Sequence, residues 1–202
     1  MKYNKVSFGT SEAVFNKLGG ERGITDFLSG KTQVVKLGKN FPTLMTIEVG
    51  LYGENDLIKI IKKDKQIKTD ESNNILDWPP LFDFNERTSL ELVVVTPEEL
   101  GFEPMFESCA NYENICERAN RYGLDECPSE LGMLISLPQY GLKNEFYIVA
   151  SKLLRDQKGE KHLLVPWFEE DGKCELKAWK VEQGKSFHTG FHFIFVRRNV
   201  QI

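Results

Sequence analysis

Residues 111–137, NYENICERANRYGLDECPSELGMLISL, constrain the fold most, because two helix signals, a turn and a stop follow one another directly. Apolar side chains recur at spacings of three and four over 112–122, which is the stripe of an amphipathic helix. Asn111 can cap the first turn with its side-chain oxygen. Gly123 can end the helix, because glycine adopts the left-handed conformation needed there.

A second helix is predicted directly after this one, over 129–137. Pro128 suits the first position of a helix, since the N–H that it lacks would have no partner there. Pro138 ends the helix, because proline cannot continue it. The sequence therefore predicts two short helices, joined by a tight turn, that share one apolar side.

The rest of the chain reads as short helices and strands. Alternation and apolar runs indicate strands, whereas spacings of three and four indicate helices. A DG turn at Asp171-Gly172 predicts a hairpin, and the prolines of the aromatic segment 75–84 predict an extended conformation. We expect helices over 12–18, 24–28 and 56–67, and strands over 33–37, 43–52, 89–96, 145–154, 161–168, 174–181 and 187–197.

These elements predict an α+β fold in two parts. Residues 1–86 would form a small N-terminal αβ unit, and residues 87–202 a helix pair packed on a C-terminal antiparallel sheet. The short connections after residue 138 favour an antiparallel meander over a parallel sheet, which needs crossover helices. The alternative is that both parts form one continuous core.

Composition narrows the function. The 202 residues carry 26 basic and 30 acidic side chains, so the net charge of −4 argues against nonspecific nucleic-acid binding as the main role. No apolar run is long enough to span a bilayer, and residues 1–15 lack the apolar core of a signal peptide, so we expect a cytoplasmic protein and no membrane. The four cysteines lack zinc-site spacing, so we expect no metal and no cofactor.

Several segments resemble a recurring type of uncharacterised bacterial protein found in candidate-phylum genomes. They are FNKLGGERGITDFLSG, TIEVG, VVVTPEELGF, YENICERANRYGLDECPSELG, EFYIVAS and FIFVRRN. The resemblance extends over most of the chain, and it implies no particular activity.

A more distant likeness concerns GLDECPSELG, which is similar in layout to the GxRLPTExEW turn of C-type-lectin-like and formylglycine-generating-enzyme-like domains. In those domains two helices also precede antiparallel strands. Here Cys127-Pro128-Ser129 replaces the Leu-Pro-Thr triplet, and the paired catalytic cysteines and the calcium-binding EPN and WND motifs are absent. The likeness therefore implies a lectin-like binding scaffold without the chemistry of these enzymes.

Three residues are weak candidates for catalysis. Cys127 precedes the predicted second helix, and a helix N-terminus can lower the pKa of a thiol. His188 and His192 lie four residues apart near the C-terminus, and histidine titrates near neutral pH. Packing or capping is the favoured explanation for Cys127, because the sequence identifies no carboxylate that would orient such a pair.

Four residues are candidates for ligand binding. Trp167 and Trp179 lie on the predicted C-terminal strands, and Trp179 becomes a surface candidate if it faces outward. Arg197 and Arg198 could bind a phosphate or carboxylate group. Core packing is the alternative for both tryptophans.

We therefore expect a binding or accessory protein and not an enzyme, with a partner protein as the preferred ligand. Many aromatics on an antiparallel sheet, and the lack of a recognised catalytic motif, favour this hypothesis. The first alternative is a hydrolase that uses Cys127 or His192. The second is nucleic-acid contact through the lysines of 59–68 together with Arg197 and Arg198.

Overall fold

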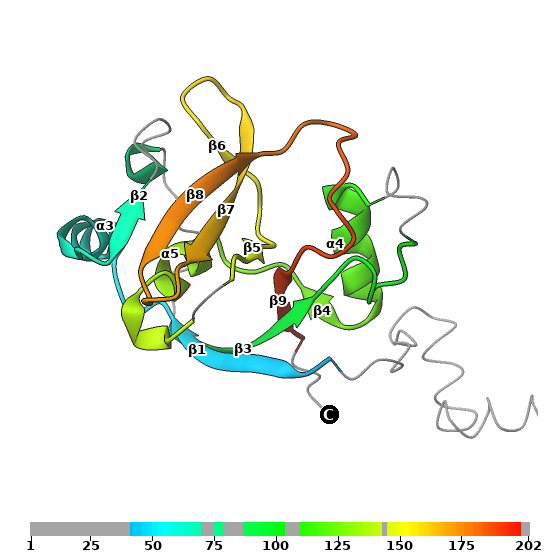
Figure 1. Ribbon diagram of the computed structural model, residues 1–202, viewed down its shortest axis with the longest axis horizontal. Helices are drawn as coiled ribbons and strands as arrows, with labels where there is room; N and C mark the ends of the chain where they lie inside the picture. The colour runs from blue at the N-terminus through cyan, green and yellow to red at the C-terminus, as the bar shows by residue number, and fades with distance from the viewer. Residues whose placement is uncertain (1–40, 70–74, 79–86, 104–109, 143–144, 199–202) are drawn as a thin grey trace, which may run out of the picture. The chain divides into compact units, whose positions relative to one another are not determined.

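The computed structural model describes residues 41–69, 75–78, 87–103, 110–142 and 145–198 (Figure 1). The chain divides into two units, Met1–Lys36 and Leu37–Ile202, and every described residue belongs to the second unit. The helices predicted over 12–18 and 24–28 and the strand predicted over 33–37 lie outside the described residues.

The fold is α+β, with two mixed sheets and three α-helices among the described residues. Sheet A pairs its strands in the order β1-β3-β9-β4, and β5 lies next to β9 on the same side as β4. Its strands are β1 (Thr43–Val49), β3 (Thr88–Val95), β9 (Phe193–Arg197), β4 (Leu124–Asp125) and β5 (Ile148–Val149).

Sheet B pairs its strands in the order β2-β8-β7-β6. They are β2 (Ile67–Thr69), β8 (Cys174–Lys180), β7 (Lys161–Phe168) and β6 (Leu154–Arg155). The predicted hairpin is confirmed, because Gly172 has a φ of 84° and its N–H bonds to the carbonyl of Glu169 between β7 and β8.

The predicted meander is wrong in two respects. β2 pairs parallel with β8, and β5 pairs parallel with β9. The last strand also leaves sheet B and pairs with β3 in sheet A. Connection length could not reveal this, because both parallel pairs join segments that are distant in sequence.

The helix pair forms, but its two members pack in different cores. α4 (Tyr112–Arg121) has the predicted cap, since Asn111 accepts a hydrogen bond from the N–H of Asn114 at 2.9 Å. α5 spans only Leu131–Ile135 and is buried throughout. The idea of one shared apolar side is therefore wrong.

The first core includes α5, the inner side chains of α3 (Glu54–Lys63), and Leu164, Leu176 and Ile194. The second core includes α4 together with Leu163, Val165, Phe193 and Phe195. Neighbouring residues of β7 and β9 thus alternate between the two cores. The segment 75–84 begins as a 3₁₀ turn, η1 (Ile75–Asp77), and is not extended there; Trp78 is buried in the first core.

Two further strand predictions were too long. Of the strand predicted over 145–154, only β5 and the start of β6 are regular, because the chain changes partner along it. The N–H of Tyr147 bonds to Pro166 of β7, whereas the next N–H, of Ile148, bonds to His192 ahead of β9. Residues 145–150 therefore connect the two sheets, and the predicted strand 187–197 is regular only over β9.

The described parts of both predicted regions share one sheet. β1, from the region predicted over 1–86, pairs along its length with β3, from the region predicted over 87–202. This pairing accords with the alternative of a continuous core. The division found by contacts falls earlier, between Lys36 and Leu37.

Candidate functional site

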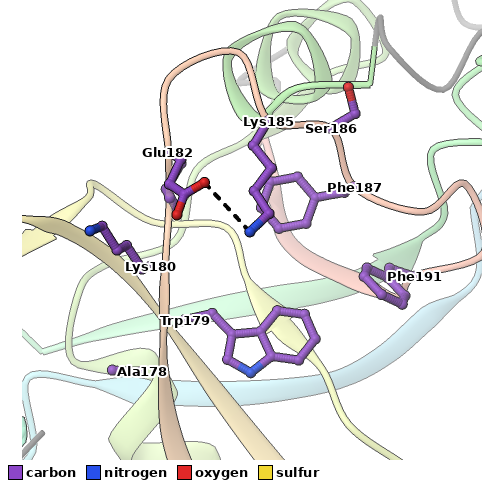
Figure 2. Close-up of a pocket in the computed structure, with 9 residues that line it drawn as sticks. Ala178, Trp179, Lys180, Glu182, Lys185, Ser186, Phe187 and Phe191 are labelled. Atoms are coloured by element: carbon purple, nitrogen blue, oxygen red, sulfur yellow. Dashed lines mark ion pairs between the residues drawn. The ribbon is translucent and has the colours of Figure 1, made fainter.

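A cavity of about 370 Å³ opens beside β8, on the face of sheet B that turns toward the second core. Its walls come from β8 and from the loop that leads to β9 (Figure 2). The side chains of Trp179, Phe187 and Phe191 face this space. Lys185 lies at the rim, with its Nζ 3.6 Å from a carboxylate oxygen of Glu182.

The aromatic wall continues beyond the cavity. The ring of Phe146 lies 5.6 Å from that of Trp179 and 5.4 Å from that of Phe191. Trp167 stacks on the other side of the network, 5.4 Å from Phe146 at an interplanar angle of 28°. We call Phe146, Trp167, Trp179, Phe187 and Phe191 the aromatic surface. It brings together the two predicted tryptophans.

Trp167 is the most exposed member of this surface, with 42% of its area accessible. Its ring contacts Phe146 and also Lys177, whose Nζ lies 4.7 Å from the ring centroid. Trp179 is half-buried and lies on the same face of β8 as Glu175 and Lys177. It therefore meets the condition set for a surface candidate, although its neighbours in the second core keep part of it covered.

Arg197 and Arg198 lie elsewhere and already have partners. Arg197 donates to Glu91 at 2.7 Å and to the carbonyl of Phe41 at 2.6 Å. Arg198 donates through two nitrogens to Asp125. Both guanidinium groups thus tie strands and a loop of sheet A together. Their role in ligand binding stays a prediction.

Cys127 is buried, and its thiol donates to the carbonyl of Ile194 at 3.3 Å. Burial raises its pKa well above the ordinary value for a thiol. This direction is opposite to the one that the sequence suggested, because desolvation outweighs any effect of the short helix that follows. The neutral thiol is a poor nucleophile.

His188 and His192 are at least partly accessible. The hydrogen bond of the Cys127 thiol goes to Ile194 and to neither histidine. Nδ1 of His192 contacts the carboxylate of Glu145, and Glu145 also accepts a hydrogen bond from the hydroxyl of Tyr147 at 3.1 Å. Burial, then Glu145, raises the pKa of Tyr147 to about 12. His188 accepts a hydrogen bond from the N–H of Gly190. The cluster around His192 links the 145–150 segment to the terminal strand.

Three of the five lysines over 59–68 lie beside carboxylates. Lys59 pairs with Asp56 and Lys62 with Asp77, both at 3.2 Å. Lys68, which follows the helix, lies 3.8 Å from Glu169. Such pairing lowers the local positive potential on which phosphate binding depends, and nucleic-acid contact through this helix stays a prediction.

A second cleft, of about 560 Å³, lies between α4 and the start of β7 and has walls of both charges. Burial raises the pKa of Glu126 here, and Lys152 partly opposes this shift. Burial also raises the pKa of Cys116 to about 12. No wall of this cleft offers stacked aromatic rings comparable to those beside β8.

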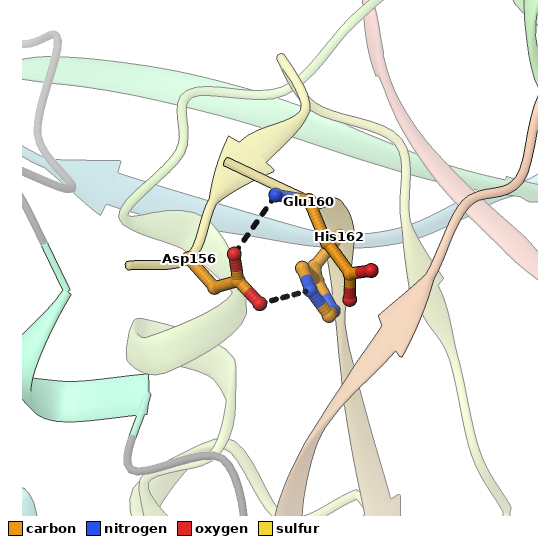
Figure 3. A group of neighbouring side chains, drawn as sticks. All are labelled: Asp156, Glu160 and His162. Carbon is orange, nitrogen blue, oxygen red and sulfur yellow. Dashed lines mark hydrogen bonds and ion pairs between the residues drawn. The ribbon is translucent and has the colours of Figure 1, made fainter. Parts of the chain in front are cut away.

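A cluster that sequence reasoning missed lies at the β6–β7 turn (Figure 3). Asp156, Glu160 and His162 bring their ligand atoms within 4.8 Å of one another. Burial raises the pKa of Asp156, but the N–H groups of Glu160 and Lys158 and then His162 lower it more, so it lies below the ordinary value. The signal in the sequence is an Asp, a Glu and a His that lie within the seven residues 156–162, on either side of Gly159, where two predicted strands meet.

Comparison of the chain with family models, with curated proteins and with solved structures gave no match. The lectin-like likeness therefore stays a prediction. Among the described helices, none has the length and apolar character needed to cross a membrane.

Proposed function

We propose that this chain is a non-enzymatic binding protein that holds an apolar side chain of a partner protein in the cavity beside Trp179. One observation carries the proposal: the aromatic cavity continues through Phe146 to Trp167, which remains 42% exposed. Exposed tryptophan in a packed ring network is typical of the residues that dominate binding energy at interfaces.

The shape of the surface favours a polypeptide over a small compact ligand. The cavity is near the lower end of small-molecule pockets, which enclose about 300–1,000 Å³. The aromatic surface extends past it by two ring-to-ring steps of 5.4 to 5.6 Å. An extended segment presents side chains on one face about every 6.6 Å, so it could contact the cavity and Trp167 together.

The rings are also held in place before binding. Phe146 contacts three of the other rings, and Lys177 covers part of Trp167. A preorganised surface loses little side-chain entropy on association. The lysines at the rim have carboxylate partners, Glu160 for Lys180 and Glu182 for Lys185, so apolar contact and not net charge should select the partner.

The test uses peptides selected from a random phage-displayed library on the wild-type chain. They would be titrated into ¹⁵N-labelled protein while the indole N–H signals are followed. The chain has three tryptophans, and Trp78 is buried in the first core. We expect the signals of Trp167 and Trp179 to shift and that of Trp78 to stay.

Variants sharpen this test. Trp167→Ala should weaken peptide binding by about tenfold, since interface tryptophans commonly contribute more than 1 kcal/mol. Leu51→Ala is the matched control, because Leu51 is the other large apolar side chain exposed among the described residues. Failure to select any peptide, or equal losses in both variants, would contradict the proposal.

The hydrolase alternative is tested at Cys127. We expect iodoacetamide at pH 7 to modify the native chain at Cys127 far more slowly than a model thiol, because the thiol is buried and neutral. Mass spectrometry of the peptide that contains Cys127 separates it from the other cysteines. Rapid modification at this residue would favour the hydrolase.

A further inference from the structure

The β6–β7 turn places one buried imidazole between two carboxylates. His162 is the second residue of β7 and is only 4% exposed, whereas the side chains of Asp156 and Glu160 are 15% and 41% exposed. Figure 3 shows the three side chains beside one another, and their ligand atoms lie within 4.8 Å of one another. The group is therefore open to solvent on the side of Glu160 and closed on the side of His162.

The hydrogen bonds of His162 are incomplete. Its Nε2 lies 3.3 Å from Asp156 Oδ2, while its buried Nδ1 has no hydrogen-bond partner among the described residues. If Nε2 carries the proton, Nδ1 is a buried lone pair without a donor. If Nδ1 carries it, the Nδ1–H is a buried donor without an acceptor among the described residues, and two lone pairs face each other across Nε2 and Oδ2. A cation between these atoms removes the repulsion in the second arrangement.

Asp156 is positioned as a ligand by its other oxygen. Oδ1 accepts the N–H groups of Lys158 at 2.9 Å and Glu160 at 2.8 Å, which leaves Oδ2 directed at His162. The separation of 3.3 Å is long for a charge-assisted hydrogen bond, which is usually about 2.7–2.9 Å. It matches the edge of a tetrahedron, about 3.3–3.4 Å, around a zinc ion with ligands at about 2.0–2.1 Å.

We propose that Asp156, Glu160 and His162 bind a divalent cation of the zinc class, with one nitrogen and two oxygen ligands from the chain and water in the remaining position. Glu160 completes the set by rotation of its exposed side chain. This rotation would break the contact with Lys180, whose Nζ lies 2.5 Å from Glu160 Oε1. Lys180 therefore competes with the metal for this carboxylate.

The donor set selects among cations. Imidazole nitrogen suits Zn²⁺, Co²⁺ and Ni²⁺, whereas Mg²⁺ and Ca²⁺ prefer sites made only of oxygen. Three protein ligands also leave a position open, which is the arrangement of zinc sites that hold a water molecule. We expect Zn²⁺ to bind and Ca²⁺ and Mg²⁺ to give no measurable binding.

The experiment titrates Zn²⁺ into the full chain, free of any affinity tag, by calorimetry. We expect one ion per chain. In the ¹⁵N spectrum the indole signal of Trp78 should move, because its ring centroid lies 4.8 Å from that of His162. The signals of Trp167 and Trp179 should not move, so this result is independent of peptide binding at the aromatic surface.

Two conservative variants test the ligands without removing the buried ring. Asp156→Asn and Glu160→Gln should each lower Zn²⁺ affinity by about tenfold or more. His192→Gln is the matched control, since His192 also pairs with a carboxylate, Glu145. Lys180→Met should raise the affinity, because it removes the competing cation.

The proposal is overturned if Zn²⁺ binds Asp156→Asn and Glu160→Gln as tightly as it binds the wild type, or if His192→Gln loses the binding instead. Equal binding of Ca²⁺, or a shift of Trp179 in place of Trp78, would also overturn it. Denaturation curves with EDTA show whether each variant is folded before its affinity is compared.

Discussion

The two faces of the β7–β8 hairpin differ in what they present at successive positions. The pair His162–Lys180 belongs to the face of the first core, and the next pair, Leu163–Trp179, belongs to the face of the second core. One face ends in buried imidazole and carboxylates beside Trp78, whereas the other ends in half-exposed rings around a cavity. A shift of one residue along a strand thus exchanges ionic for apolar chemistry.

The contrast lies in how each face is closed. On the first face α5 packs directly on β7 and covers Leu164 in the middle of the strand, whereas Glu160 at the β6–β7 turn is partly exposed. On the second face α4 and the loop before β9 leave the cavity beside Trp179. The first face therefore carries a buried polar group at one end, whereas the second face carries a partly exposed apolar site with preorganised rings.

The largest expected effect comes from a substitution between α5 and β7, in the first core. Gly132→Ala should lower the free energy of unfolding by about 3 kcal/mol, because overpacking a core typically costs about 1–3 kcal/mol. The new Cβ would lie 2.6 Å from the Cβ of Leu164, so β7 or α5 must move. Denaturant unfolding measures this.

Gly141→Ala is the comparison variant for Gly132. Gly141 has a φ of 66° and open space around it, so it should lose about 1 kcal/mol from backbone strain alone. Equal losses in the two variants would show that α5 does not pack directly on β7.

The second prediction separates the two tryptophans of the aromatic surface. Trp179→Ala should destabilise the chain by about 2 kcal/mol, below the 3–5 kcal/mol of a fully buried aromatic, because the ring is half-covered by Phe146 and Phe191. Trp167→Ala should cost less than about 1 kcal/mol, since its ring is 42% exposed. If Trp167→Ala lowered the free energy of unfolding more than Trp179→Ala does, our assignment of Trp167 as the more accessible ring would be wrong.

The third prediction concerns acid stability of the ionic end. The folded-state pKa of Asp156 is lowered, so its stabilising contribution is present above the unfolded value of about 3.9 and is lost as pH falls through the folded pKa. Asp156→Asn should therefore flatten the decline of melting temperature below about pH 4. Melting curves from pH 2.5 to 7, with EDTA present, measure this.

Glu126 in the mixed-charge cleft gives the opposite sign. Its folded pKa is raised, so ionisation favours the unfolded chain as pH rises past about 4.3. Glu126→Gln should therefore raise the melting temperature at neutral pH. At the same pH, Asp156→Asn should lower the melting temperature. A change of the melting temperature in the same direction in both variants would contradict the pKa shifts of Glu126 and Asp156.

The smallest effect is expected at Lys177. Its ammonium group lies over the exposed Trp167 ring, and such exposed contacts contribute about 0.5–1 kcal/mol. Lys177→Met should lower the free energy of unfolding in urea by about 0.5 kcal/mol. If the rings of Trp167 and Trp179 act separately, this loss should add to the loss caused by Trp179→Phe. A loss above about 1 kcal/mol would mean that Lys177 organises the whole aromatic surface.

Helix ends and turns could be predicted from the sequence. The Asn111 cap, the Gly123 stop and the Asp171-Gly172 hairpin are confirmed, because each depends on a few neighbouring residues. Gly123 has a φ of 77°. Leu92, Val93 and Val95 are fully buried and Val94 is half-buried in the predicted strand 89–96. Trp167 and Trp179 were chosen as surface candidates and do lie in one network with Phe146.

The pairing of strands that are distant in sequence could not be predicted. Nothing local to Phe193 indicates that it pairs with Val95 on one side and Ile148 on the other. The alternation of 174–181 is matched by the burial of Cys174, Leu176 and Ala178, but it gave no sign that Trp179, on the other face, packs partly in the second core. The approach of Asp156, Glu160 and His162 depends on the hairpin register, which places the turn residues beside the first residues of β7.

The place of β9 has a consequence for synthesis. β3 has β1 as its only neighbour in sheet A until Phe193–Arg197 arrives, about a hundred residues later in translation. A ribosome-bound chain that stops short of residue 193 thus carries an unprotected apolar strand, Leu92 to Val95, able to template aggregation with its neighbours on a polysome. Expression of such truncated products should yield inclusion bodies unless a chaperone shields that edge.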